Sequence, residues 1–81
     1  MPYYYVYILE TDATPKRYYT GLTGYLEFRL EAHNSGQVPH TKKNKPWHIK
    51  TAIAFTDKKK ALDFETYLKS ASGRAFAKKR L

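Results

Sequence analysis

The chain has 81 residues, with 15 lysines and arginines against seven acidic residues and no cysteine. This length fits one domain, residues 1–81, which buries only about 60% of its unfolded surface, so a functional site must share residues with the core. The lack of cysteine excludes a disulfide framework and a thiolate zinc site. No apolar run approaches the ~18 residues of a membrane span, and the start lacks the basic flank of a signal peptide, so we expect a cytoplasmic protein without membrane contact.

The first residues are predicted to form a β-hairpin. The aromatic and β-branched run Tyr3–Leu9 is typical of a strand buried on both faces. The polar, proline-containing stretch Thr11–Lys16 favours a turn. Because the short Tyr-rich run Arg17–Gly21 follows that turn directly, we expect it to pair with the first strand in the antiparallel direction.

A helix is predicted next, and its apolar stripe holds two polar residues. Thr23 is expected to cap this helix, which ends near Asn34 with Gly36 as its stop. At 100° per residue, Arg29 and His33 share the arc of the leucines at positions 22, 26 and 30. Acidic partners would satisfy both side chains structurally, and arginine can lay its stem on apolar surface. The alternative is a phosphate site, because guanidinium binds phosphate oxygens in a bidentate fork.

The second half of the chain is predicted to hold a basic loop, a strand and two helices. In chain order these are a mobile loop Gln37–His48, a strand Ile49–Phe55, a helix capped by Thr56 or Asp57 that runs to about Lys69, and a shorter helix that begins at Ser72. The order strand–strand–helix–strand–helix–helix indicates an α+β fold.

The second helix carries a carboxylate in its apolar stripe. Glu65 falls between Leu62 and Leu68 on the helical wheel. A carboxylate there is costly unless it is paired or binds a metal, so it either forms a salt bridge with Arg29 or Lys69 or binds a hard cation such as Mg²⁺. In the second case the tyrosines, Arg29, His33 and Glu65 would line one pocket suited to phosphodiester hydrolysis.

The basic residues are concentrated in the second half. Residues 1–40 hold three basic and four acidic residues, a net charge of −1, whereas residues 41–81 hold twelve and three, a net charge of +9. A basic half on so small a domain is typical of a protein that binds nucleic acid. A surface that is cationic only for solubility is the alternative.

Three segments carry a resemblance to a known family. The tripeptides Tyr5-Val6-Tyr7 and Tyr19-Thr20-Gly21 flank the predicted turn, and the run Leu26–Gly36 that carries Arg29 and His33 follows them. With Glu65 next in order, the chain resembles a GIY-YIG nuclease domain, and within that family the small stand-alone bacterial members. It departs from the signature where Tyr5 replaces a glycine and Thr20 an aliphatic residue, and neither change touches the phenols.

The resemblance implies a sheet of three antiparallel strands flanked by helices and a nuclease that cuts DNA with one divalent metal, Mg²⁺ or Mn²⁺. It implies that Glu65 is the metal ligand, that Arg29 holds and neutralises the scissile phosphate, that His33 belongs to the same site, and that a signature tyrosine helps water attack. Tyr7 is expected to be the base and Tyr19 its hydrogen-bonding companion, although the reverse assignment is open. An unperturbed tyrosine, with a pKa of ~10, is a poor base at neutral pH, so nearby Arg29 and the metal must favour its phenolate or share the proton.

A binding module that does not cut nucleic acid is the competing interpretation. In either case basic and aromatic side chains would contact the substrate: Lys42, Lys43, Lys45, Trp47, Lys78, Lys79 and Arg80. The preference for DNA over RNA rests on the resemblance alone. So small a domain has little area for reading bases, which leaves an unidentified protein partner or weak self-association open, as is association with a bacterial nucleoid.

Overall fold

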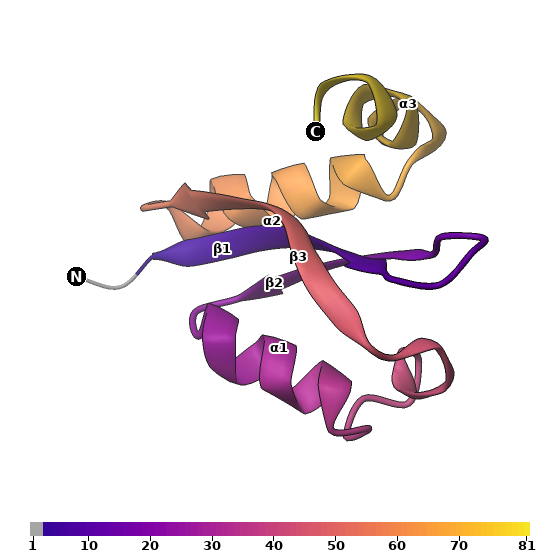
Figure 1. The fold of residues 1–81 in the computed structure, drawn as a ribbon. Helices are drawn as coiled ribbons and strands as arrows, with labels where there is room; N and C mark the ends of the chain where they lie inside the picture. The colour runs from indigo at the N-terminus through magenta and orange to yellow at the C-terminus, as the bar shows by residue number, and fades with distance from the viewer. Residues whose placement is uncertain (1–2) are drawn as a thin grey trace.

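The computed structural model describes residues 3–81 and has the expected α+β fold (Figure 1). Its elements in chain order are β1 (Tyr4–Thr11), β2 (Tyr18–Thr23), α1 (Leu26–Asn34), a 3-10 helix (Lys42–Asn44), β3 (Trp47–Phe55), α2 (Lys58–Leu68) and α3 (Ala71–Arg80). The three strands form one antiparallel sheet in the order β2-β1-β3. The predicted sheet and the predicted order of strands and helices are confirmed.

Strand β1 is central because its side chains are apolar on both faces. Val6 and Ile8 pack with Ala61 and Leu68 in one buried cluster. Tyr7, Leu9 and Trp47 form a second cluster on the opposite face, against which side chains of α1 pack. Figure 1 shows the same layers, with α1 on one side of the sheet and α2 and α3 on the other. The sheet therefore separates two small cores, as the doubly apolar first strand predicts.

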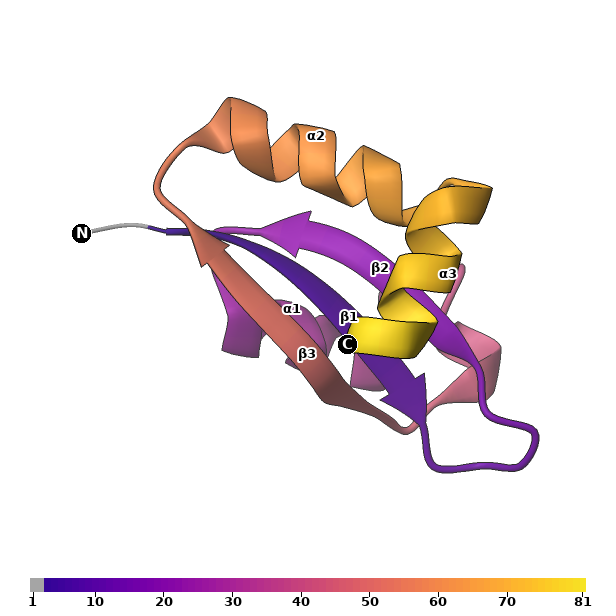
Figure 2. The same cartoon turned by 90° about the horizontal axis from the view of Figure 1, so that it is seen from above.

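Helix α3 returns the chain to the sheet. The Thr51 hydroxyl of β3 donates a hydrogen bond of 2.9 Å to the Leu81 carbonyl, and the end of α3 lies over the strands when the molecule is viewed from above (Figure 2). Among residues 3–81, none of the helices combines the length and the apolarity needed to cross a bilayer.

The helix starts differ in part from those expected. Asp57 caps α2, one of the two predicted caps, by accepting bonds from the Lys59 and Lys60 amides. Thr23 instead ends β2, and α1 begins three residues later, after Tyr25. Strand pairing takes precedence over the capping propensity of Thr23 because β2 extends two residues beyond its predicted end.

The third helix begins earlier than the expected start at Ser72. Its cap is Ser70, whose hydroxyl accepts a bond of 3.1 Å from the Gly73 amide. Helix α3 therefore begins at Ala71 and has 10 residues, so it is nearly as long as the 11-residue α2. Both residues of the Ser70–Ser72 pair suit a helix start, and the first of them is the one used.

The segment between α1 and β3 is anchored, whereas the sequence predicted a mobile loop. It contains the 3-10 helix, and Val38 and Thr41 are buried. The Asn34 side chain holds the end of the segment, since it accepts a 2.6 Å bond from the Trp47 amide and donates a 2.9 Å bond to the Trp47 carbonyl. Strand β3 consequently begins at Trp47, two residues before its predicted start.

Candidate functional site

Tyr7 lies on the α1 face of β1 and reaches across β2. Its partner in the antiparallel register is Gly21. A Cβ atom at position 21 would overlap the Tyr7 hydroxyl and lie 3.0 Å from the Tyr7 ring carbon Cε1. The final glycine of the second tripeptide is therefore needed so that the phenol of the first can cross the neighbouring strand.

The Tyr7 hydroxyl is hydrogen-bonded to a buried histidine. It lies 3.0 Å from His33 Nε2, and His33 Nδ1 lies 2.8 Å from the Thr41 hydroxyl oxygen. The Thr41 hydroxyl donates to the Val38 carbonyl at 3.3 Å, so it accepts from His33 Nδ1–H. This network assigns the neutral Nδ1–H tautomer to His33 and leaves Nε2 to accept the phenolic proton of Tyr7.

Burial sets the protonation of both groups. Burial lowers the pKa of His33 from its ordinary value, and the charge of Arg29 lowers it further. Burial also raises the pKa of Tyr7, which outweighs the lowering by the adjacent Arg29 guanidinium. At neutral pH the pair is therefore a neutral phenol that donates to a neutral imidazole.

Tyr19 contacts the same histidine from β2. Its ring centroid lies 4.8 Å from that of His33 and 6.3 Å from that of Tyr7. The hydrogen bond of the Tyr7 hydroxyl goes to His33 and not to Tyr19, its expected companion, whose ring lies nearby. Tyr19 is only partly buried and also lines a surface groove, whereas Tyr7 is 1% exposed.

Arg29 and Glu65 influence the pKa of Tyr7 from helices on opposite sides of the sheet. Burial raises the pKa of Tyr7 most, the Arg29 guanidinium lowers it, and the negative charge of Glu65 adds to the rise. Arg29 belongs to α1 and Glu65 to α2, so the two charges come from the two helical layers of the fold. Of the five residues that the sequence placed in one pocket, Tyr7, Tyr19 and His33 are in direct contact, and Arg29 and Glu65 are linked to them by their effect on the pKa of Tyr7.

Glu65 is paired within its own helix. Its carboxylate accepts a 3.0 Å bond from Lys69 Nζ, one of the two salt bridges considered from the sequence, and its side chain is only 17% exposed. Among residues 3–81, histidines and carboxylates do not gather in threes to form a ready-made metal site. One carboxylate suits Mg²⁺ or Mn²⁺ when waters and substrate phosphate complete the coordination, so the donor set fits a cation that arrives with the substrate.

The residues predicted to bind nucleic acid fall into two groups. Six are exposed cations, Lys42, Lys43 and Lys45 around the 3-10 helix and Lys78, Lys79 and Arg80 on α3. Trp47 is instead 4% exposed, and its indole N–H donates a 2.9 Å bond to the Thr41 carbonyl. This corrects the expectation that Trp47 stacks on a base, because the small core uses its large aromatic side chain for packing.

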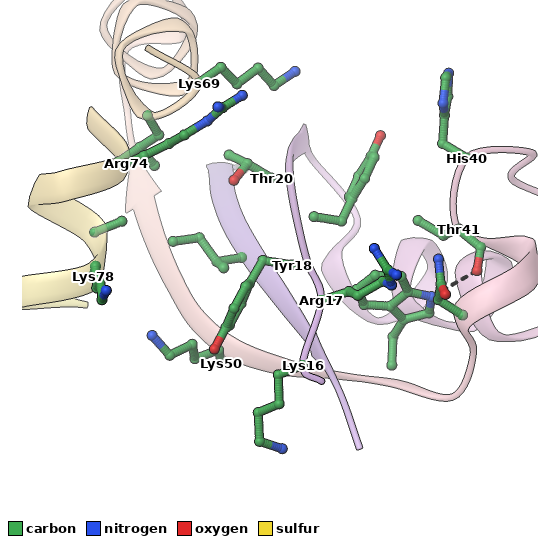
Figure 3. A pocket seen from close by; sticks show the side chains of 16 residues that line it. Lys16, Arg17, Tyr18, Thr20, His40, Thr41, Lys50, Lys69, Arg74 and Lys78 are labelled. Carbon is green, nitrogen blue, oxygen red and sulfur yellow. Dashed lines mark hydrogen bonds between the residues drawn. The ribbon is translucent and has the colours of Figure 1, made fainter. Parts of the chain in front are cut away.

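A basic groove with a volume of about 920 Å³ runs beside the site, and most of its cations were missed from the sequence (Figure 3). Its basic side chains come from the hairpin, β3, the end of α2 and α3: Lys16, Arg17, Lys50, Lys69, Arg74 and Lys78. Only Lys78 was predicted. Strand alternation predicts that Lys50 is exposed. That cations of the hairpin and of α3 share one groove appears only in the three-dimensional structure.

Thr41 is the other residue that sequence reasoning missed. Its hydroxyl and carbonyl join His33 and Trp47, so it holds the tautomer of the histidine and closes the 38–47 segment over the core. A threonine in a lysine-rich stretch gives no signal of this role. Only the return of that segment to α1 shows it.

Comparison with known proteins identifies the family. The family model of the GIY-YIG catalytic domain matches residues 3–80, nearly the whole chain. Neither curated proteins nor solved structures give a match. The match spans both tyrosine tripeptides, the helix with Arg29 and His33, and the helix with Glu65. The chain belongs to the GIY-YIG nuclease family.

Proposed function

We propose that this protein is a divalent-metal-dependent endonuclease that hydrolyses DNA phosphodiester bonds. The observation that carries the proposal is the hydrogen-bonded chain Tyr7–His33–Thr41, whose phenol has its pKa influenced by Arg29 and Glu65. A phenol is a poor base alone, and this chain gives it a proton acceptor. Membership of the nuclease family supports the same reaction class.

In the proposed mechanism, Tyr7 and His33 act as a proton relay. The phenolic oxygen accepts a proton from the attacking water while the phenolic O–H passes its own proton to His33 Nε2. Tyr7 ends neutral, and the proton resides on imidazolium, which Thr41 continues to orient through Nδ1–H. The water oxygen forms the new bond to phosphorus, and the bond to the leaving oxygen breaks. This scheme favours Tyr7 as the base, with Tyr19 packing against the imidazole.

Arg29 and Glu65 are proposed to bind the charges of the reaction. The Arg29 guanidinium suits a bidentate contact with the non-bridging oxygens of the scissile phosphate. Glu65 would hold Mg²⁺ or Mn²⁺ together with substrate phosphate, and the cation would supply Lewis-acid stabilisation of phosphate charge. Lys42, Lys43 and Lys45, which are exposed around the 3-10 helix, are proposed to contact the backbone.

A binding module that does not cut is the second candidate function, and the basic groove is the observation that favours it. A panel of single-stranded, duplex, branched and RNA substrates, each with Mg²⁺, Mn²⁺ or excess chelator, separates the two. We expect cleavage of DNA that chelator abolishes. Binding without products on every substrate would overturn the nuclease proposal.

The relay makes a prediction about pH. His33 must be neutral to accept the proton, and its pKa is lowered from the ordinary 6.5 by burial and by Arg29. We therefore expect the single-turnover rate to hold as the pH falls through 6.5 and to decline only at lower pH, as the imidazole becomes protonated. The measurement is a pH–rate profile at saturating enzyme, compared with the titration of the His33 ring followed by NMR.

Two outcomes would contradict the relay. One is an acid limb of the profile above the ordinary value of histidine. The other is an acid limb that does not coincide with the titration of the His33 ring.

A further inference from the structure

The basic groove differs from the rest of the surface in charge. None of the described residues that line it is an aspartate or a glutamate, and six of them are lysines or arginines. Glu10, which lies near Tyr18, is already engaged: its carboxylate pairs with His48 at 3.0 Å. Burial raises the pKa of Glu10, but the Tyr18 hydroxyl, His48 and Lys16 more than offset this and hold it below its ordinary value. The groove thus suits a polyanion.

Three residues that line the groove also contact the proposed catalytic network. Tyr19 lines it and contacts the His33 ring at 4.8 Å between centroids. Thr41 lines it and is bonded to His33 Nδ1. Lys69 lines it and pairs with the Glu65 carboxylate. A chain that lies in the groove therefore passes next to residues that contact His33 and Glu65.

The path of the groove curves around the edge of the sheet. Tyr18 and Tyr19 are consecutive in β2, so their side chains point to opposite faces, yet both line the groove. Figure 3 shows Lys50 and Tyr18 on the side of α3, with His40 and Thr41 at the other end. Double-stranded DNA is stiff, with a persistence length of about 150 base pairs, and does not follow so short a curve. A flexible single strand does.

Tyr18 supplies a surface on which an unpaired base can stack. Its side chain is 55% exposed although Lys50 Nζ lies 5.5 Å from the ring centroid. An aromatic ring within a track of cations is the combination that binds single strands with little sequence preference. Paired bases in a duplex do not offer their faces to such a ring.

We infer that the basic groove binds a single-stranded flank of the nucleic acid whose scissile phosphate lies at the Tyr7–His33 pair. The inference rests on the proposed function for the position of the cut, and it names the substrate class: a nucleic acid with a single-stranded arm next to the cleaved bond. Lys50, Arg74 and Lys78 contact the phosphates of this arm, and Tyr18 stacks on one of its bases.

Two variants test the cations that line the basic groove. In the groove variant, alanine replaces Lys50, Arg74 and Lys78. In the matched control, alanine replaces three exposed lysines of α2 that lie outside the groove, Lys58, Lys59 and Lys60. Affinity for oligo-dT, oligo-U and a blunt duplex is measured without divalent metal over a range of salt. We expect the groove variant alone to lose affinity for single strands, with a salt slope lower by about 0.7 per lost contact, or about 2 in total.

Substitutions at Tyr18 test the stacking. Tyr18→Phe keeps the ring and should keep the affinity, whereas Tyr18→Leu should lose about fivefold or more, the lower end of base–aromatic stacking. Comparison of the oligo-dT and oligo-U arms decides whether the bound strand is DNA or RNA. Thermal melting of each variant verifies that it is folded.

Equal salt slopes for the groove and control variants, or an equal loss on the blunt duplex, would overturn the inference even if the wild type cleaves DNA. If the wild type cleaves nothing but the groove variant alone loses single-strand affinity, the strand site stands and the nuclease proposal fails. If the groove variant alone loses single-strand affinity and the wild type cuts tailed substrates faster than blunt ones, the strand site and the nuclease proposal are both supported.

Discussion

Replacement of Arg29 by alanine is expected to lower the single-turnover cleavage rate by roughly 10² or more, the effect of removing one preorganised transition-state donor. Arg29 lies beside the Tyr7 hydroxyl, where its charge lowers the pKa of that phenol. Negative charge on the phosphate oxygens grows as water attacks. The guanidinium therefore binds the transition state more tightly than the ground state. Substrate affinity should change far less, because the lysine-rich surfaces supply most of the contacts.

The control for Arg29→Ala is Lys60→Ala, which removes one exposed cation of α2 away from the site. Single-turnover rates and equilibrium affinities are measured for both, beside thermal melting, because Arg29 is partly buried and unfolding would imitate a catalytic defect. An affinity loss as large as the rate loss would mean that Arg29 only binds substrate.

The sequence points to the candidate site more directly than to the surface around it. Arg29, His33 and Glu65 stand out as candidates because a polar residue in an apolar helical stripe conflicts with packing. The sequence identifies Gly21 only as part of the second tripeptide, and the structure adds that it leaves the room that the Tyr7 phenol needs to cross β2. Local pattern was sufficient for these residues because each lies within a regular element with a known period.

Other features depend on contacts between distant segments. Trp47 and Thr41 stand in a stretch rich in lysine and proline, yet the first is 4% exposed and the second 1%. Their burial follows from the bonds between Asn34 and the Trp47 backbone, which join positions 13 residues apart. The cations of the groove likewise come from the hairpin, β3 and α3. No sequence window contains these partners together, so period and propensity do not predict them.

Replacement of Glu65 by glutamine is expected to abolish metal-dependent cleavage while the fold persists. Glutamine has the same shape and can still accept a bond from Lys69, which now pairs with the carboxylate at 3.0 Å. A neutral amide is a poor ligand for a hard cation, and Glu65 has no cluster of acidic or histidine neighbours among residues 3–81 to replace it. Loss of several kcal/mol of Lewis-acid stabilisation predicts a rate lower by at least about 10².

Helix α2 offers a matched control for this prediction, because Asp63 is also paired with a lysine four residues away, Lys59, at 3.2 Å. The Asp63 side chain is 69% exposed. The Glu65 side chain is 17% exposed, and its charge raises the pKa of Tyr7. Cleavage rates are measured over a range of Mg²⁺ and Mn²⁺ concentrations for Glu65→Gln and Asp63→Asn. Only Glu65→Gln should lose activity. Equal rates for the two variants, or full activity of the wild type in excess chelator, would show that Glu65 does not act as a metal ligand.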